Sequence, residues 1–405
     1  MSLIRPFAGL RPAPGMAAAV IAPPYDVLSS EEARAQAAGK PWSFLHISKP
    51  EIDLPPGTDP YRPEVYAKGR DNFARMLEAK VLQRDLAPYY YFYRLTMGTH
   101  TQLGLVAVAS CAAYEANRIR RHEYTRPDKE DDRVRQIDTL NAQTGPVFLA
   151  YRHDAAIDAL AATATAGVPD ADVTAGDGVR HTLWVVRDAA LIDALTRAFD
   201  ARACLYICDG HHRSAAAARV AAQDRTRDSA QYFLAVLFPD EQTRIFDYNR
   251  VVKDLNGLTP DEFLQRIEAA FTIEPVTAAM KPTRPREVGL YLGRRWYRLR
   301  IRPERVSSDP VRRLDVSLLQ DHLIAPILGI TDPRRDQRID FVGGIRGLAE
   351  LERRVDSGEM AAAFALHPTS LADLMAVADA GQVMPPKSTW FEPKLADGLV
   401  SHVVD

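Results

Sequence analysis

The stretch Leu205-Tyr-Ile-Cys-Asp-Gly-His-His-Arg-Ser-Ala-Ala-Ala-Ala-Arg219 guides the interpretation of the whole chain. Its first residues are apolar and predict a buried strand, Asp209-Gly210 predicts a tight turn, and the alanine-rich part predicts a helix. A helix N-terminus presents unpaired N–H groups and the positive end of the helix dipole, and a glycine there lets the backbone approach a ligand closely. The stretch therefore predicts a phosphate-binding turn between a strand and a helix.

The side chains of this turn suit the same chemistry. Arg213 can donate two N–H groups to phosphoryl oxygens, and His211 or His212 can donate as well. Asp209, at the end of the strand, can bind Mg²⁺ or accept a proton from a hydroxyl group. The alternative interpretation is structural: Asp209 caps the helix, Gly210 makes the turn, and the histidines lie on the surface.

Strand and helix patterns alternate on both sides of this stretch, which predicts a mixed α/β fold. Strand patterns cover residues 89–95, 103–109, 146–151, 181–187 and 232–238, and helix patterns cover residues 128–143, 155–166, 189–200 and 212–223. We place a core domain over residues 1–255. A second, smaller α+β module is expected over residues 256–405, with its last segment returning to the site.

The composition of the 405-residue chain is that of an ordinary globular protein, with 46% hydrophobic and 26% charged residues. Lys+Arg 51 and Asp+Glu 53 nearly balance, so the general basic excess of nucleic-acid-binding proteins is missing. Three cysteines form no disulfide framework, and we expect a reducing, cytoplasmic environment. We find neither a signal peptide nor an apolar run of the roughly 20 residues that span a bilayer.

A second polar block, Arg118-Ile-Arg-Arg-His-Glu-Tyr-Thr-Arg-Pro127, places four arginines around His122 and Glu123. The alternation of Ile119 with charged residues suits an exposed strand. Like charges at this density repel one another, so either an anionic ligand lies among the arginines or they pair with the acidic run at residues 128–132. A carboxylate among arginines stays ionised, which makes Glu123 a candidate general base.

A third block, Met384-Pro-Pro-Lys-Ser-Thr-Trp-Phe-Glu-Pro-Lys394, lies near the C-terminus. Its prolines stiffen the backbone, so its hydroxyl and ammonium groups are held at fixed positions. We expect Lys387, Ser388 and Thr389 to return to the turn and contact phosphates. The alternative is a strap held only by burial of its aromatic side chains.

These blocks resemble those of a known family. Asp209-Gly-His-His-Arg213 with its alanine-rich helix is similar to the signature box of the ParB/sulfiredoxin-like superfamily, which binds nucleotide phosphates. Within that superfamily the chain resembles the bacterial domain-of-unknown-function ten-fifteen family, through Ile21-Ala-Pro-Pro-Tyr-Asp26, His122-Glu-Tyr-Thr125, the box and the block at 384–394. The related free serine kinases have Asp-Gly-His-Thr-Arg where this chain has His212 in the fourth place.

The resemblance implies a ParB/sulfiredoxin-like nucleotide-binding core and a nucleotide-dependent phosphotransferase acting on a small hydroxylated metabolite, with free serine suggested by the kinases. It implies ATP or ADP with Mg²⁺ as cofactors and a small molecule as partner, rather than nucleic acid or a membrane. Two alternatives stay open: a non-catalytic nucleotide-binding switch of the ParB type, and a metal-dependent phosphatase or hydrolase. The oligomeric state is not set by the sequence.

The residues assigned to the site fall into three groups. We assign catalysis to Glu123 and Asp209, with Asp209 also as metal ligand; nucleotide binding to Gly210, His211, His212, Arg213, Lys387, Ser388 and Thr389; and substrate binding to Tyr25, Asp26, His122, Thr125 and Arg126.

Overall fold

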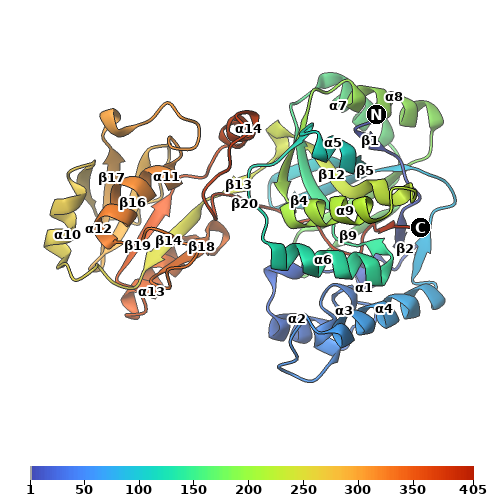
Figure 1. Ribbon diagram of the computed structural model, residues 1–405, viewed down its shortest axis with the longest axis horizontal. Coiled ribbons are helices and arrows are strands. Elements are labelled where there is room, and N and C mark those ends of the chain that lie inside the picture. Colours follow the sequence, from blue (N-terminus) through green and yellow to red (C-terminus); the bar gives the residue numbers. More distant parts are fainter. Residues whose placement is uncertain (1) are drawn as a thin grey trace. The chain divides into compact units, whose positions relative to one another are not determined.

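The computed structural model describes residues 2–405, and the described chain divides into two units. The first comprises residues 2–243 together with 393–405, and the second comprises residues 244–392 (Figure 1). The predicted boundary after residue 255 lies too late, because strand β14 (Tyr248–Val252) pairs with two strands of the second unit. The predicted module at 256–405 also included residues 393–405, which pack in the first unit.

A mixed sheet forms the centre of the first unit. In the described part of the chain it has nine strands, in the order β6 (Ile119–Arg120), β11 (Leu205–Asp209), β8 (Val147–Tyr151), β12 (Tyr232–Pro239), β5 (His100–Ser110), β4 (Tyr90–Met97), β10 (Arg180–Val186) and β9 (Ala171–Thr174), with β1 (Ile4–Arg5) beside β5. Strand β11 runs parallel to β6 and antiparallel to β8. The strand that ends at Asp209 is therefore held on both sides.

Helices cover the sheet and supply the rest of its core: α5 (Cys111–Glu115), α6 (Pro127–Leu140), α7 (Ala155–Ala164), α8 (Ala189–Asp200) and α9 (His211–Gln223). Helix α9 buries Ala215–Ala218 and Val220 in the same core as Phe233 and Leu237 of β12. Small alanine side chains let a helix approach its neighbours closely, and α6 lies alongside α9 (Figure 1). The alanine run thus fixes where α9 begins relative to the sheet.

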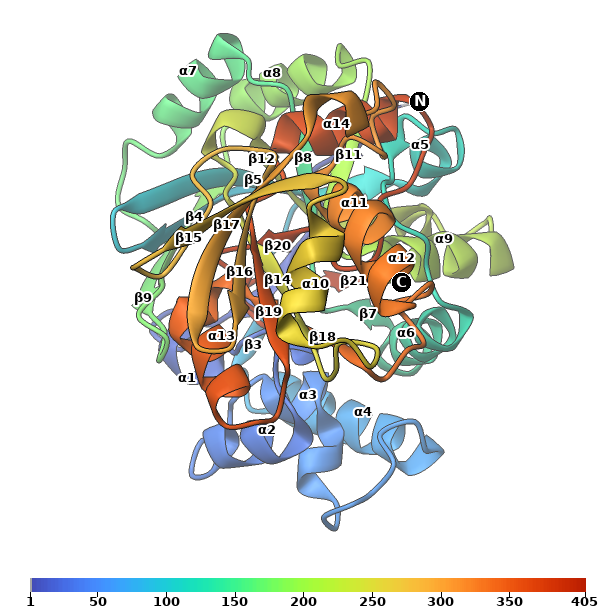
Figure 2. The same ribbon diagram turned by 90° about the vertical axis from the view of Figure 1, so that its left-hand side faces the viewer.

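A second apolar cluster lies at the opposite end of the first unit from α7 and α8 (Figure 2). It contains residues of α1 (Ala17–Val20), α2 (Ser30–Ala37), α3 (Leu45–Ser48) and α4 (Pro63–Glu78). Two short strand pairs adjoin this region, β2 (Leu10–Pro12) with β3 (Leu82–Arg84) and β7 (Ala142–Gln143) with β21 (His402–Val403). The C-terminal segment is thereby held beside the end of α6.

The second unit has its own sheet and core. Its sheet has the order β15 (Phe271–Val276), β17 (Arg295–Ile301), β16 (Glu287–Leu292), β19 (Ala362–Leu366), β14 and β18 (Ile339–Gly343), and a separate pair joins β13 (Ile245–Phe246) to β20 (Trp390–Phe391). Its helices are α10 (Pro260–Ile267), α11 (Asp315–Leu319), α12 (Ala325–Leu328), α13 (Gly347–Asp356) and α14 (Leu371–Asp379). Val251, Trp296 and Leu351 belong to its apolar core.

The structure confirms the mixed α/β fold. The strand patterns expected at 89–95 and 103–109 correspond to β4 and β5, which form a hairpin that turns through Gly98 at a φ of 58°. The expected exposed strand in the block at 118–127 is wrong, because only β6 is strand and its Ile119 is fully buried. Among the described residues, no helix has the length and apolar character needed to cross a membrane.

Candidate functional site

The turn between β11 and α9 has the geometry that the sequence predicts. The pairing of β11 with β8 is irregular between Ile207 and Asp209, and Gly210 then takes a φ of 95° as the N-cap of α9. Among the described residues, no side chain caps this helix. The first turn of a 13-residue helix is thus left with its N–H groups and positive dipole end available to an anion.

Asp209 does not cap the helix, contrary to the structural alternative. Its Oδ2 lies 3.2 Å from Lys394 Nζ, and its Oδ1 lies 3.7 Å from a terminal guanidinium nitrogen of Arg213. Burial works to raise the pKa of Asp209, but the positive charges of Lys394 and Arg213 outweigh burial and hold that pKa well below its usual range. The carboxylate is therefore ionised and a weak proton acceptor.

Arg213 points from the first turn of α9 towards the start of β8. Its side chain is largely buried and donates a hydrogen bond to the carbonyl of Pro146. Burial disfavours its charge, yet the carboxylates of Asp209 and Asp26 raise its pKa above the ordinary value. Arg213 thus remains a cation within the fold.

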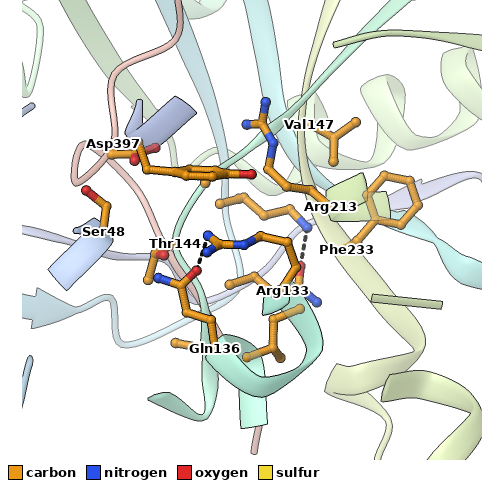
Figure 3. A pocket seen from close by; sticks show the side chains of 14 residues that line it. Ser48, Arg133, Gln136, Thr144, Val147, Arg213, Phe233 and Asp397 are labelled. Carbon is orange, nitrogen blue, oxygen red and sulfur yellow. Dashed lines mark hydrogen bonds between the residues drawn. The ribbon is translucent and has the colours of Figure 1, made fainter. Parts of the chain in front are cut away.

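Arg213 also lines a small pocket of the first unit, with a volume of about 30 Å³, which is room for one or two water molecules (Figure 3). The pocket brings together distant parts of the chain and is lined by Tyr25, Ser48, Arg133, Gln136, Ile137, Ala142, Gln143, Thr144, Gly145, Val147, Arg213, Phe233, Leu234 and Asp397. The Arg133 guanidinium lies 4.0 Å from the centre of the Tyr25 ring. It also pairs with Asp132 at 2.6 Å.

Asp397 is the most unusual group of this pocket. The residue is 2% exposed, and its Oδ1 has no hydrogen-bond partner among the described residues. Burial raises the pKa of Asp397 to about 7, although Arg213 acts in the opposite direction. A buried carboxyl oxygen without a partner costs stability, so the pocket is a place where a polar ligand or water can be bound.

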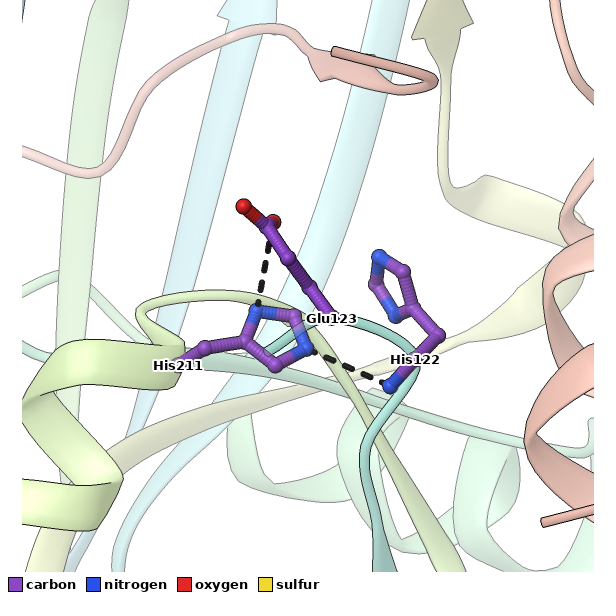
Figure 4. Close-up of side chains that lie close together, drawn as sticks. All are labelled: His122, Glu123 and His211. Carbon is purple, nitrogen blue, oxygen red and sulfur yellow. Dashed lines mark hydrogen bonds and ion pairs between the residues drawn. The ribbon is translucent and has the colours of Figure 1, made fainter. Parts of the chain in front are cut away.

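Three further side chains meet beside the turn: His122, Glu123 and His211 (Figure 4). The His122 backbone N–H donates to His211 Nε2 at 3.5 Å, and His211 Nδ1 lies 3.9 Å from Glu123 Oε2. The two imidazole rings are 4.5 Å apart and nearly perpendicular. Burial lowers the pKa of His122 to about 4 and that of His211 well below its ordinary value, so both rings are neutral.

The arginines of the block at 118–127 have structural partners. Arg118 donates to the carbonyls of Asp200 and Arg202, and Arg121 donates to the hydroxyl of Tyr114. Arg126 pairs with Asp128 at 2.7 Å, as the acidic-run alternative expected. Of these contacts only the pair with Asp128 neutralises an arginine charge, whereas Arg118 and Arg121 donate to neutral oxygen atoms.

Several predicted substrate-binding residues also lie near the turn. The Arg126 backbone N–H donates to His212 Nε2 at 3.1 Å, which ties the loop that carries Thr125 to α9. Tyr25 lines the pocket with Arg213, and the charge of Asp26 acts on Arg213. The structure thus brings the segments around residues 25, 122 and 211 together.

Lys387, Ser388 and Thr389 belong to the second unit. The Ser388 hydroxyl donates to the Pro385 carbonyl at 2.6 Å, and Lys387 Nζ lies 5.6 Å from the centre of the Tyr248 ring. These contacts are local to that unit. The proposed phosphate contacts of all three residues stay predictions.

Sequence reasoning did not assign Lys394 and Asp397 to the site. Lys394 is the last residue of the block at 384–394. We instead assigned Lys387 to the site, because it is next to the hydroxyl residues Ser388 and Thr389. Asp397 is a lone acidic residue in the otherwise apolar run at 395–400, a pattern that could have identified it as buried.

The chain is a mixed α/β protein with a buried, charged pocket beside an uncapped helix N-terminus. It belongs to the family described as "Protein of unknown function (DUF1015)", whose model matches residues 4–317. No curated protein matches the chain by sequence. Its placement in the ParB/sulfiredoxin-like superfamily stays a prediction.

Three solved structures are similar at low identity. A free serine kinase in complex with AMP is 14% identical and has a TM-score of 0.36, with 73% of this chain and 92% of that chain covered. SbnI with a C-terminal truncation from Staphylococcus aureus is 9% identical, with a TM-score of 0.40 and coverage of 72% and 85%. A conserved hypothetical protein from Pyrococcus furiosus is 13% identical, with a TM-score of 0.34 and coverage of 72% and 93%. At these values the likeness assigns no activity to this chain.

The burial of Asp397 predicts a pH dependence of stability. Its pKa is raised from 3.8 to about 7 in the folded state, so the folded protein holds a proton that the unfolded chain has lost between these pH values. This group therefore lowers the free energy of unfolding as pH rises from about 4 to 7, by up to about 1.4 kcal/mol per pH unit. Asp397→Asn removes this contribution. In urea unfolding, the free energy of unfolding of the variant should therefore rise relative to that of the wild type as pH increases from about 4 to 7. Asp193→Asn, at an exposed position of α8, is the control. Parallel pH profiles for Asp397→Asn and wild type would contradict the assignment.

Proposed function

We propose that this protein is a nucleotide-dependent phosphotransferase for a small hydroxylated metabolite, with free serine as the first acceptor to test. The observation that carries the proposal is the uncapped start of α9 at Gly210, with Arg213 in its first turn. Backbone N–H groups, the helix dipole and a guanidinium at one place are the elements that hold phosphates.

The nucleotide, ATP or ADP, binds through its terminal phosphates at this turn. Arg213 and Lys394 both lie next to Asp209, and the Arg213 contact is loose at 3.7 Å, so a phosphate can compete with the carboxylate for these cations. Because Gly210 has no side chain, the Arg213 guanidinium packs directly against the turn, where a phosphate would meet it. His212, partly exposed on the same turn, is the third proposed donor.

Glu123 is the proposed base. Its side chain is 48% exposed, so it can reach an acceptor, and it lies beside the neutral His211. Asp209 is less suited, because two cations stabilise its ionised form. In the proposed step the acceptor hydroxyl gives its proton to Glu123 while its oxygen forms a bond to the terminal phosphorus. The bond from that phosphorus to the bridging oxygen breaks, and the nucleotide leaves with one phosphate fewer.

Mg²⁺ was expected at Asp209, and the donor set there does not fit it. Both carboxylate oxygens already face cations, Lys394 and Arg213, so a Mg²⁺ ion bound there would have to displace one of them. No step of the proposed transfer is therefore assigned to a metal at Asp209. In this proposal, the turn positions the phosphates and its positive charges stabilise the transition state of the transfer.

Replacing Gly210 tests nucleotide binding at the turn. In Gly210→Ala the new Cβ would lie 3.0 Å from Arg213 Nε, so the guanidinium must shift. The residue also has a φ of 95°, and its methyl group would hinder the approach of a phosphate to the backbone. We expect ATP or ADP affinity to fall by at least about tenfold, as for loss of one charged contact. Gly178→Ala is the matched control, because that glycine has a φ of 83° with nothing within 4 Å. Isothermal titration calorimetry measures both, and unchanged affinity in Gly210→Ala would refute the phosphate-binding turn.

Replacing Glu123 tests the chemistry. Glu123→Gln keeps the shape of the side chain and removes its basicity, so turnover should fall by roughly 10²–10⁴-fold with little change in nucleotide affinity. Phosphorus NMR with serine and other hydroxyl compounds detects the product, and Glu115→Gln, at an exposed end of α5, is the control. Full activity of Glu123→Gln would show that another group is the base. Nucleotide binding without any phosphorylated product would favour the non-catalytic switch.

A further inference from the structure

We propose that His122, Glu123 and His211 form a binding site for a divalent transition metal of the Zn²⁺ type. The site stands on its own contacts and does not require the proposed phosphotransfer. Two imidazole nitrogens and one carboxylate oxygen are a ligand set that zinc uses when a fourth position is left to water. Figure 4 shows the three side chains converging from the loop before α6 and from the first turn of α9.

The distances suit a site that closes on the metal. One ligand atom from each residue lies within 4.8 Å of those of the other two. Tetrahedral ligation at about 2.0–2.2 Å places ligand atoms roughly 3.3–3.6 Å apart, so the trio must contract by about 1 Å. Glu123 is the exposed member, so its side chain has room to move towards a metal.

An independent observation points to a missing ligand. His122 is 2% exposed, and its Nδ1 has no hydrogen-bond partner among the described residues. A buried nitrogen without a partner is costly, and a metal bond removes that cost. Adjacent His212 lies outside the trio because its Nε2 accepts from the Arg126 backbone.

The surroundings leave both rings ready to bind. The rings are neutral, which is the form that binds a metal. The contact between the His122 backbone and His211 Nε2 is 3.5 Å long, which makes it a weak hydrogen bond that a metal can replace. Nitrogen donors favour Zn²⁺ or Co²⁺ over Mg²⁺, so the site differs in chemistry from the Mg²⁺ site expected at Asp209.

Metal binding at this site would also affect the proposed phosphotransfer. Only this consequence rests on the proposed function. A metal bound to Glu123 takes up the carboxylate that would accept the hydroxyl proton. Zn²⁺ would therefore inhibit phosphotransfer without displacing the nucleotide from the turn.

The test is metal binding to the EDTA-treated full-length protein in the absence of nucleotide. We expect calorimetry to show one Zn²⁺ per chain, and Co²⁺ to give the visible absorption of a four-coordinate site that excess Mg²⁺ does not remove. His211→Gln should weaken Zn²⁺ binding by on the order of 100-fold, and His212→Gln should leave it unchanged. Absence of a stoichiometric Zn²⁺ site in the wild type, or wild-type affinity in His211→Gln, would overturn the proposal.

A second variant keeps the test decisive if His211→Gln does not fold. Glu123→Gln alters an exposed side chain, so the fold is expected to survive, and Zn²⁺ affinity should fall by at least about tenfold. Unchanged affinity in this variant would also overturn the site. His153→Gln is the control for incidental binding, since His153 pairs with Asp158 on the surface. Because no nucleotide is present, failure of the phosphotransfer proposal leaves the metal result unaffected.

Discussion

The ion pair between Lys394 and Asp209 ties the C-terminal segment to the end of β11. Through this pair, and through β21 on β7, residues 393–405 are held in the first unit beside the turn that begins α9. Lys394 and Arg213 together balance the one carboxylate of the turn and leave a net positive charge there. The ionised Asp209 thus has a positioning role: it fixes two cations where an anion would be bound.

The same arrangement explains why Asp397 is tolerated in the core. A buried carboxyl group is costly, but Arg213 and Arg133 lie close enough to oppose the effect of burial on its ionisation. Both arginines are themselves buried and charged, with acidic partners of their own. The pocket is therefore a network of alternating charges in which a change at one residue alters the ionisation of the others.

Local features of the site could be predicted from the sequence, and long-range ones could not. The strand, the turn at Gly210 and the alanine-rich helix depend on residues that are neighbours in sequence, so the local sequence pattern is sufficient to predict them. The contact of Lys394 with Asp209 and the place of Asp397 beside Arg213 depend on how the C-terminal segment returns to the first unit, which no periodicity encodes. The domain boundary was misplaced for a similar reason, because the pairing partners of β14 lie far along the chain.

Glu123 is where the two proposals meet, and its environment explains how one side chain can serve both. As the exposed member of a trio with two buried, neutral histidines, it is the only one of the three that can turn towards a substrate or towards a metal. His122 and His211 are neutral and place nitrogen donors beside this carboxylate. An exposed carboxylate can accept a proton or bind a metal through the same oxygen atoms, so one role excludes the other.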